Sequence, residues 1–279
     1  MNNSMQLKDK LKNISNKDNL EFNVVLRNYM YERFIERLAC SKYKDNFILK
    51  GGYYLSAIFG LNYRQTMDID LSLKNEKLTA ENILKIINEI IAIDIGDNVN
   101  IFIDGISSIR EEDEYGGYRV KLTVKIENVR ESFSVDIATG DPITPREIEF
   151  KYKTIFDYKY IDLKSYNLET ILSEKLETIL SRKELNGRLK DFYDIYLIYT
   201  LAREKLDNDI LRKAIYNTFK KRKFNDDINE AFEIIENSYV LRLRWKSYVR
   251  HNRYAKDILY EDIMSCLKEF IGILETISI

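Results

Sequence analysis

The chain has 279 residues, enough for one large domain or two small ones with an ample apolar core. Its 44 basic and 45 acidic residues nearly cancel, so no overall field attracts nucleic acid or membrane, and any such contact needs a local patch. A Ser-His-Asp triad or a zinc site would have to be built around the single histidine, His251. Carboxylates and lysine are therefore the expected catalytic groups.

The cysteines and the apolar pattern indicate where the protein works. Cys40 and Cys266 offer neither a disulfide framework nor a metal-site spacing, as expected in a reducing compartment. The first residues lack the apolar core of a signal peptide, and no apolar run approaches the length of a membrane span. We therefore expect a soluble cytoplasmic protein with no membrane partner.

The first predicted elements are helical. Ser15 could cap the start of a first helix, and a stripe of apolar residues predicts a helix over residues 21–42 that covers a sheet. A short apolar run at Phe47–Leu49 then meets Gly51 and Gly52, where a second helical pattern begins. A glycine pair at the start of a helix lets the backbone turn sharply and points free N–H groups toward an anion.

The segment DIDLSL, after the loop Gly60–Met67, alternates between polar and apolar residues and predicts a strand. Because strand side chains alternate between faces, Asp68 and Asp70 share the face opposite the core. Their Cβ atoms would lie roughly 6.6 Å apart, and two such carboxylates could hold the pair of Mg2+ ions used in in-line phosphoryl transfer. A solvated strand face is the alternative for Asp-x-Asp alone, and the glycine turn upstream favours the metal site.

Residues 79–93 predict an amphipathic helix that Thr79 caps, with an apolar side formed by Leu84, Ile87 and Ile91. Alternation then predicts three strands with one solvated face each, at Val99–Ile103, Val120–Ile126 and Phe133–Ile137, the first two joined by an acidic turn at Glu111–Gly117. The third strand places Asp136 opposite its buried residues. Pro142 and Pro145 keep the next segment irregular.

From Leu168 onward the pattern is helical throughout. The predicted helices cover residues 167–184, 188–204, 208–221, 226–236, 239–250 and 259–276. Strands with a covering helix, followed by a run of helices, predict an α+β fold with a mixed β-sheet core and a helical C-terminal half. We expect a catalytic core over residues 1–150 and a helical domain over residues 151–279 that completes the active site.

Three blocks of this sequence resemble a known family. The glycine turn, helix and Asp-x-Asp strand, "LKGGYYL…YRQTMDIDLSL", resemble the first motif of the nucleotidyltransferase fold. With "SVDIA" around Asp136 and "EKLETILSR…RLKDFYDIYLI" further on, the chain resembles the AbiEii/AbiGii abortive-infection toxins, the toxic halves of type IV toxin–antitoxin pairs. The resemblance implies a nucleotidyltransferase that uses Mg2+ or Mn2+ and a nucleoside triphosphate.

The resemblance also implies roles for single residues. Asp68, Asp70 and Asp136 would hold the metal, and Asp136 could help to deprotonate the acceptor hydroxyl. Lys175 would contact the triphosphate, a role that suits a compact ammonium charge. The other implied nucleotide or catalytic residues are Gly51, Gly52, Tyr53, Arg182, Arg188, Asp191 and Asp194. Asp191 is favoured over Asp194 as the residue that faces the site. The alternative for the charged residues of these helices is that they form solvated ion pairs with their neighbours.

One departure from the family concerns the glycine turn. Nucleotidyltransferases usually carry Gly-Ser at this point, and this family often has Gly-Gly-Thr, where the present chain has Tyr53. The hydroxyl that would bind a phosphate oxygen is therefore missing at its expected place, and backbone N–H groups would have to suffice.

The molecule that receives the nucleotide is inferred from the family resemblance alone. Some members of the wider toxin family modify the 3′ end of tRNA, so RNA, and tRNA first, is the expected acceptor, with GTP or CTP as candidate nucleotides and a cognate antitoxin as partner. The alternatives are transfer to a protein or a small molecule such as an aminoglycoside, and a GTP-binding regulator without turnover. A segment near the C-terminus interleaves basic and aromatic residues, which suits contact with RNA phosphates and stacking on bases. The alternative is an ordinary helix that buries its apolar residues and leaves its charges outside. The residues are Arg242, Arg244, Trp245, Lys246, Tyr248, Arg250, His251, Arg253, Tyr254 and Lys256.

Thr66 is a candidate control point because it lies just before Asp68, on the loop that leads into the strand. A phosphate on its hydroxyl would add about −1.5 to −2 charges beside the carboxylates and would oppose nucleotide binding. Tyr63 and Tyr53 are weaker candidates. The alternative is a local turn bond from the Thr66 hydroxyl to the backbone.

Overall fold

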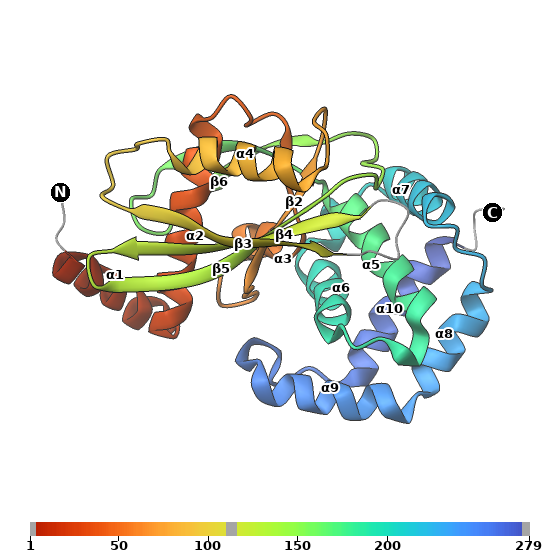
Figure 1. The fold of residues 1–279 in the computed structure, drawn as a ribbon. Coiled ribbons are helices and arrows are strands. Elements are labelled where there is room, and N and C mark those ends of the chain that lie inside the picture. The colour runs from red at the N-terminus through yellow and green to blue at the C-terminus, as the bar shows by residue number, and fades with distance from the viewer. Residues whose placement is uncertain (1–3, 110–115, 275–279) are drawn as a thin grey trace. The chain divides into compact units, whose positions relative to one another are not determined.

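The computed structural model describes residues 4–109 and 116–274, and the chain forms two compact units (Figure 1). Residues 1–140 and 148–165 belong to the first unit, and residues 141–147 and 166–279 belong to the second. The expected division at residue 150 falls within the strand Ile148–Lys153. Most of the expected acidic turn, Glu111–Gly117, lies outside the described residues.

The first unit is built on a mixed sheet that has seven strands in the described part of the chain, in the order β3-β4-β5-β2-β1-β7-β6. β2 runs parallel to β5 and β1 runs parallel to β7, while the other neighbours are antiparallel. The strands are β1 Phe47–Lys50, β2 Asp68–Leu73, β3 Asn100–Ile109, β4 Gly117–Ile126, β5 Val129–Ala138, β6 Ile148–Lys153 and β7 Tyr160–Ser165. The predicted α+β class is confirmed.

The strands expected from alternation are present, whereas β6 and β7 were missed by the expectation of an irregular segment after Pro145. β6 lies at the edge of the sheet and buries Tyr152 while most of its side chains stay at least partly exposed, so no apolar run marks it. β7 buries Ile161 and Leu163 in alternation with polar residues, which is a pattern too short to be distinctive.

The helices of the first unit are α1 Ser4–Asp18, α2 Phe22–Cys40, α3 Gly51–Phe59 and α4 Ala80–Ile91. The prediction for Ser15 was wrong. Ser15 lies in the last turn of α1, and its hydroxyl donates to the carbonyl oxygen of Leu20 at 2.7 Å. It therefore supports the connection from α1 to α2 and does not cap the start of a helix.

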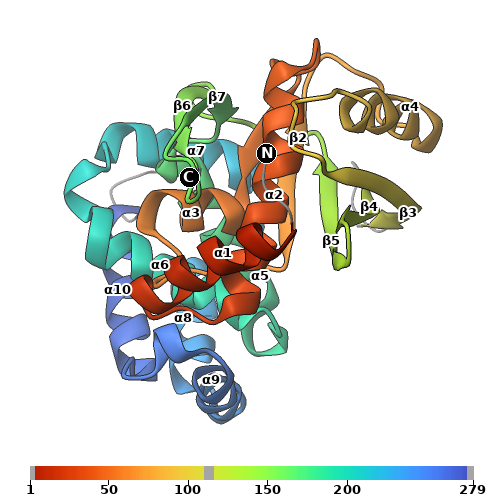
Figure 2. The ribbon, with the colours of Figure 1, turned by 90° about the vertical axis from the view of Figure 1, so that its left-hand side faces the viewer.

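The helix α4 begins where predicted, because the Thr79 hydroxyl accepts a hydrogen bond from the backbone N–H of Asn82 at 3.2 Å. Its buried face differs from the prediction. Leu84 and Ile91 are only half-buried, and the fully buried residues are Ile83, Ile86, Ile87 and Ile90. This face packs on β3 and β4, above which α4 lies in Figure 2.

The apolar face of the sheet is covered by α2 and α4, which also contact each other. Tyr31 and Phe34 of α2 meet Phe133 of β5 with ring centroids 4.7 Å and 6.4 Å apart. Tyr53 of α3 is fully buried between Tyr31 and Tyr152, and it stacks on Tyr152 at 5.7 Å. Because one face of the sheet is filled in this way, polar residues of β2, β4 and β5 occupy the other face.

The second unit is helical, as predicted. Its α-helices are α5 Leu168–Arg182, α6 Leu189–Ala202, α7 Asn208–Lys221, α8 Ile228–Asn237, α9 Tyr239–His251 and α10 Tyr260–Leu274. Arg222 follows α7 and donates to both carboxylate oxygens of Asp141, at 3.0 Å each, and to Glu177 of α5 at 2.7 Å. This arginine ties residues 141–147 to α5 and α7. No helix in residues 4–109 and 116–274 is both long and apolar enough to cross a lipid bilayer.

A buried carboxyl group connects α2 to the edge of the sheet. Oε1 of Glu32 accepts hydrogen bonds from the Tyr152 hydroxyl at 2.9 Å, the Ile155 N–H at 2.8 Å and the Asn28 amide at 3.2 Å. Burial raises the pKa of Glu32 to about 7, although the hydrogen bonds from Ile155 and Tyr152 oppose the shift. The folded protein therefore keeps Glu32 mainly protonated below about pH 7, whereas the unfolded chain ionises it above about pH 4.5.

We expect the substitution Glu32→Gln to remove a pH dependence of stability. The pKa of Glu32 rises from 4.5 to about 7 on folding, so its contribution is fully present below pH 4.5 and is lost as the pH rises through 7. The wild type should lose up to about 3 kcal/mol relative to Glu32→Gln over this range. Urea denaturation of both proteins at about pH 5 and about pH 8 measures the difference, and parallel changes in the two proteins would contradict the prediction.

Candidate active site

The turn between β1 and α3 brings the backbone against a carboxylate. Gly51 has φ +64°, and a Cβ atom at this position would lie 2.2 Å from Oδ2 of Asp70. The backbone N–H of Gly52 donates to the same oxygen at 3.3 Å. The first turn of α3 therefore faces Asp70, and the positive end of the helix dipole favours the ionised carboxylate. Only glycine at position 51 permits this approach.

The predicted arrangement of β2 is confirmed. Ile69, Leu71 and Leu73 are buried in the core, while Asp68 and Asp70 are half-buried on the opposite face. Asp68 is oriented by a neighbour, since the Thr66 hydroxyl donates to its Oδ1 at 2.7 Å and to its carbonyl oxygen at 3.2 Å.

Thr66 also lies close to the glycine turn. A Cβ atom on Gly52 would be 3.1 Å from the Thr66 hydroxyl oxygen and 2.8 Å from Nη2 of Arg64. Arg64 is buried, so its guanidinium group places a positive charge beside the first turn of α3. The hydroxyl of Tyr31 donates to the carbonyl oxygen of Thr66 at 3.3 Å. The local turn bond considered for Thr66 is thus present, and the loop is tied to α2.

The strand register aligns four charged residues across the sheet. Asp70 of β2 has Asp136 of β5 as its neighbour on one side and Lys50 of β1 on the other. Arg119 of β4 is the cross-strand partner of Asp136. Residues aligned in this way point to the same face of a sheet, so Arg119, Asp136, Asp70 and Lys50 form a row with acidic residues in the middle and basic residues at the ends.

Arg119 forms a bidentate salt bridge with Asp136. Nε of Arg119 donates to Oδ1 at 2.7 Å, and Nη2 donates to Oδ2 at 2.6 Å. This bond raises the pKa of the Arg119 guanidinium group, and the charges of Asp136, Asp68 and Asp70 raise it further. The sequence analysis did not single out Arg119, because a basic residue on the solvated face of a strand carries no local signal.

The carboxylates fit a divalent cation only in part. Asp68 and Asp70 are half-exposed oxygen donors on one face, which suits Mg2+ or Mn2+. Asp136 does not complete the set as it stands, because both its oxygens accept from Arg119. Among the residues that the structure describes, no group of three acidic, histidine or cysteine side chains is placed to hold a metal ion.

Lys175, Arg188, Asp191 and Asp194, which the sequence predicts at the nucleotide site, lie in the second unit and form a second charged cluster, an ion-pair network. Nζ of Lys175 lies 2.8 Å from Oδ1 of Asp191 and 2.6 Å from Oδ2 of Asp194, and all three residues are buried. Nε of Arg188 donates to Oδ2 of Asp191 at 2.9 Å. Burial opposes ionisation, but Lys175 and Arg188 lower the pKa of Asp191 to about 2. Both aspartates thus face Lys175, while Arg182 ends α5 and is exposed.

The aromatic residues of α9 differ in burial, since Tyr239 is exposed, Tyr248 is half-buried and Trp245 lies in the protein interior. Trp245 is buried, donates from Nε1 to the carbonyl oxygen of Ile258 at 2.9 Å and stacks on Tyr248 at 5.2 Å. Tyr254 packs on Tyr193 of α6 at 4.9 Å. The interpretation of this segment as a helix core with charges outside is confirmed for Trp245, whereas Tyr248 and Tyr254 are half-buried. The exposed remainder of the predicted RNA surface is Lys246, Arg250, His251, Arg253 and Lys256.

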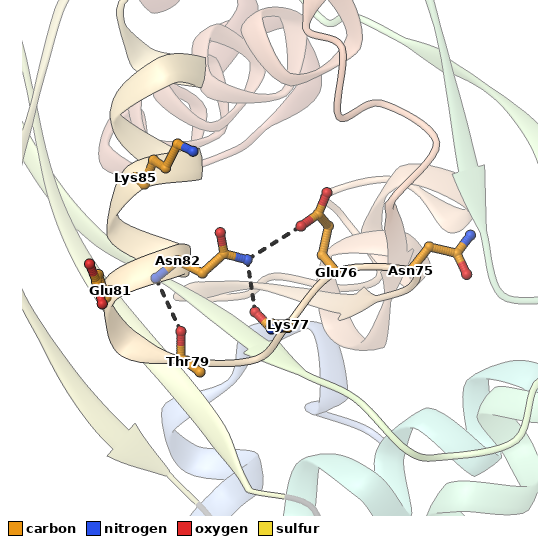
Figure 3. A pocket seen from close by; sticks show the side chains of 7 residues that line it. All are labelled: Asn75, Glu76, Lys77, Thr79, Glu81, Asn82 and Lys85. Carbon is orange, nitrogen blue, oxygen red and sulfur yellow. Dashed lines mark hydrogen bonds between the residues drawn. The ribbon is translucent and has the colours of Figure 1, made fainter.

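A hollow of about 730 Å³ lies at the connection between β2 and α4 (Figure 3). Its lining is polar, and Asn82 donates there to Glu76 at 3.3 Å and to the carbonyl oxygen of Lys77 at 2.9 Å. The hollow follows the last residue of β2, whereas Asp68 is the first, so it lies at the opposite end of the strand from Asp68.

Comparison with known proteins gives a family and a fold. The family model described as "Nucleotidyl transferase AbiEii toxin, Type IV TA system" matches residues 33–268. A crystal structure of a candidate nucleotidyltransferase from Helicobacter pylori is similar, with a TM-score of 0.50, 15% identity and coverage of 92% of this chain and 98% of that one. The crystal structure of JHP933 from the same organism has a TM-score of 0.48 and 15% identity, with coverage of 92% of this chain and 95% of that one. The first likeness supports the predicted nucleotidyltransferase fold, and no curated protein sequence matches the chain.

We expect Gly51→Ala to be more destabilising than Gly96→Ala. The two glycines have nearly the same backbone strain for a side chain, with φ +64° and +70°, but nothing lies within 4 Å of a Cβ atom at Gly96. Gly96→Ala should therefore cost only about 1 kcal/mol of backbone strain. Gly51→Ala should cost a further 1–3 kcal/mol, roughly, because its methyl group must displace the Asp70 carboxylate. Free energies of unfolding from urea denaturation test this, and equal losses would refute the close approach.

Proposed function

We propose that this chain, which belongs to the AbiEii family of nucleotidyltransferase toxins in type IV toxin–antitoxin systems, transfers a nucleotide from a nucleoside triphosphate to RNA. The 3′ end of tRNA is the proposed acceptor, and GTP or CTP is the proposed donor. The observation that carries the proposal is the placement of Asp68 and Asp70 beside the first turn of α3. The family implies a cognate antitoxin as partner.

The proposed reaction depends on positioning and on neutralising charge rather than on covalent chemistry by the protein. Asp68 and Asp70 would hold Mg2+ or Mn2+, and when bound this ion supplies positive charge to the triphosphate. Thr66 keeps Asp68 in place through its hydrogen bond. Lys50 and Arg119 offset the like charges of Asp70 and Asp136, which lie side by side.

The glycine turn is the proposed phosphate-binding element. The first turn of α3 offers backbone N–H groups, and the buried Arg64 adds a positive charge beside Gly52. The ring of Tyr53 lies in the core, so the role expected for this residue reduces to its backbone. These features compensate for the hydroxyl that Gly-Ser or Gly-Gly-Thr would supply.

Lys175 is proposed to act on the triphosphate from the second cluster, with Arg182 and Arg188 in support. The buried Asp191 and Asp194 hold its ammonium group in one position, which restricts the long side chain before any ligand binds. A fixed cation loses less conformational entropy on binding a phosphate than a mobile one does.

We expect Asp68→Asn and Asp70→Asn each to reduce nucleotide transfer by at least about 100-fold, because each removes a charge that positions the donor. Purified protein is incubated with each labelled nucleoside triphosphate and total RNA, and the products are identified by mass analysis. Asp162→Asn, on an exposed position of β7, is the control and should keep full activity. Folded Asp68→Asn and Asp70→Asn proteins with unchanged transfer would refute the proposed function.

We expect Thr66→Glu and Thr66→Val to differ strongly in the same assay. Val removes the hydroxyl that donates to Oδ1 and to the carbonyl oxygen of Asp68, which should cost about 1 kcal/mol, or about fivefold in activity. Glu adds a negative charge beside Asp68, as a phosphate on Thr66 would, and should abolish transfer. Equal activity of the two variants would show that Thr66 only orders the loop.

A further inference from the structure

Asp136 is already engaged by the protein itself. Arg119 binds both of its carboxylate oxygens, at 2.7 Å and 2.6 Å, so no oxygen of Asp136 is without a charged partner. An arginine stays protonated at any physiological pH, so the pair cannot be released by titrating the guanidinium group. Any other cation that binds Asp136 must therefore displace Arg119 or share the carboxylate with it.

The two partners differ in how firmly the fold holds them. The side chain of Asp136 is 13% exposed, whereas that of Arg119 is 40% exposed. Asp136 stands between Arg119 and Asp70 in the row across the sheet, so Asp136 is next to the acidic pair of β2. Arg119 is therefore the partner that can move into solvent, while Asp136 is held next to Asp70 by the pairing of β5 with β2.

We propose that Arg119 competes with a divalent cation for Asp136 and thereby sets how tightly this site takes up metal. Arg119 is then a positioning residue that acts through Asp136, and the site exchanges one positive partner for another. The inference rests on the proposed function only in placing the cation at Asp68 and Asp70. It goes beyond that proposal because it gives a role to Arg119 and makes metal uptake depend on breaking a specific ion pair.

Competition makes a different prediction from simple charge repulsion. Lys121 lies on β4 two positions after Arg119, on the same face of the sheet, and it is exposed. Lys121→Gln removes the same charge from the same strand, but the register places Lys121 beside Ser134 rather than Asp136. A general electrostatic effect would appear in Lys121→Gln and Arg119→Gln alike, whereas competition requires Asp136.

The test is calorimetric titration of Mn2+, without nucleotide, into the full chain. The proteins are the wild type, Arg119→Gln, Lys121→Gln, Asp136→Asn and the double variant Arg119→Gln/Asp136→Asn. Arg119→Gln should tighten Mn2+ binding at least tenfold, which corresponds to about 1.4 kcal/mol. Lys121→Gln should change it by less than about threefold. In the Asp136→Asn background, Arg119→Gln should have no larger effect than Lys121→Gln.

Arg119→Lys keeps the positive charge but cannot form the bidentate salt bridge, so the affinity of this variant for Mn2+ should lie between those of the wild type and Arg119→Gln. This variant keeps the test informative if Arg119→Gln is poorly folded, which circular dichroism would reveal. Unchanged or weaker Mn2+ binding in both Arg119 variants overturns the proposal. So does tightening that persists in full when Asp136 is replaced, and so does a failure of every variant to bind Mn2+.

The outcome is separable from that of the proposed function, because the titration contains no nucleotide and no RNA. If Asp68→Asn abolishes transfer and Arg119→Gln leaves Mn2+ binding unchanged, the function stands and the competition is refuted. If no transfer is found in any RNA but Arg119→Gln tightens Mn2+ binding through Asp136, the competition stands and the proposed function is refuted.

Discussion

The close approach of Gly51 to Asp70 is the constraint on which the candidate site depends. A backbone at φ +64° with no Cβ atom allows β1 to turn directly into α3 while the carboxylate of Asp70 occupies the space where a side chain would be. The same turn points the N–H of Gly52 at Asp70. The direction of α3 and the position of β2 are thus fixed together, because moving either one would break the contact, and the positive end of the helix dipole lies at the Asp70 carboxylate.

The charges on this face of the sheet are balanced across strands rather than along the chain. Asp70 and Asp136 are register neighbours, and their like charges would repel in the half-buried environment of the sheet. Arg119 and Lys50 flank them from β4 and β1. Four residues from four strands therefore form one electrostatic unit, and a substitution at either end of the row changes the conditions for an ion bound in the middle.

Much of this arrangement was predictable, and the reason for the rest is physical. The glycine pair and the alternation around Asp68 are local signals, because turn geometry and strand periodicity act within a few residues. The pairing of Arg119 with Asp136 depends on register between strands, which a single sequence does not reveal. The buried face of α4 was misjudged because a run rich in isoleucine and leucine permits several overlapping stripes, and contact with β3 and β4 selects one of them.

The two charged clusters of the chain share a design, each within its own unit. In the first, Arg119 is held by Asp136, and in the second, Lys175 is held by Asp191 and Asp194. In both cases an acidic partner offsets the cost of keeping a cation partly or fully out of water. They differ in mobility, because Lys175 is buried between its two partners whereas the side chain of Arg119 is 40% exposed. A phosphate that binds Lys175, as proposed, would gain less than it would from a bare charge, but it would meet a group whose position is already fixed. The phosphate would then bind less tightly but in a better defined position, and a reaction that depends mainly on positioning requires such a position.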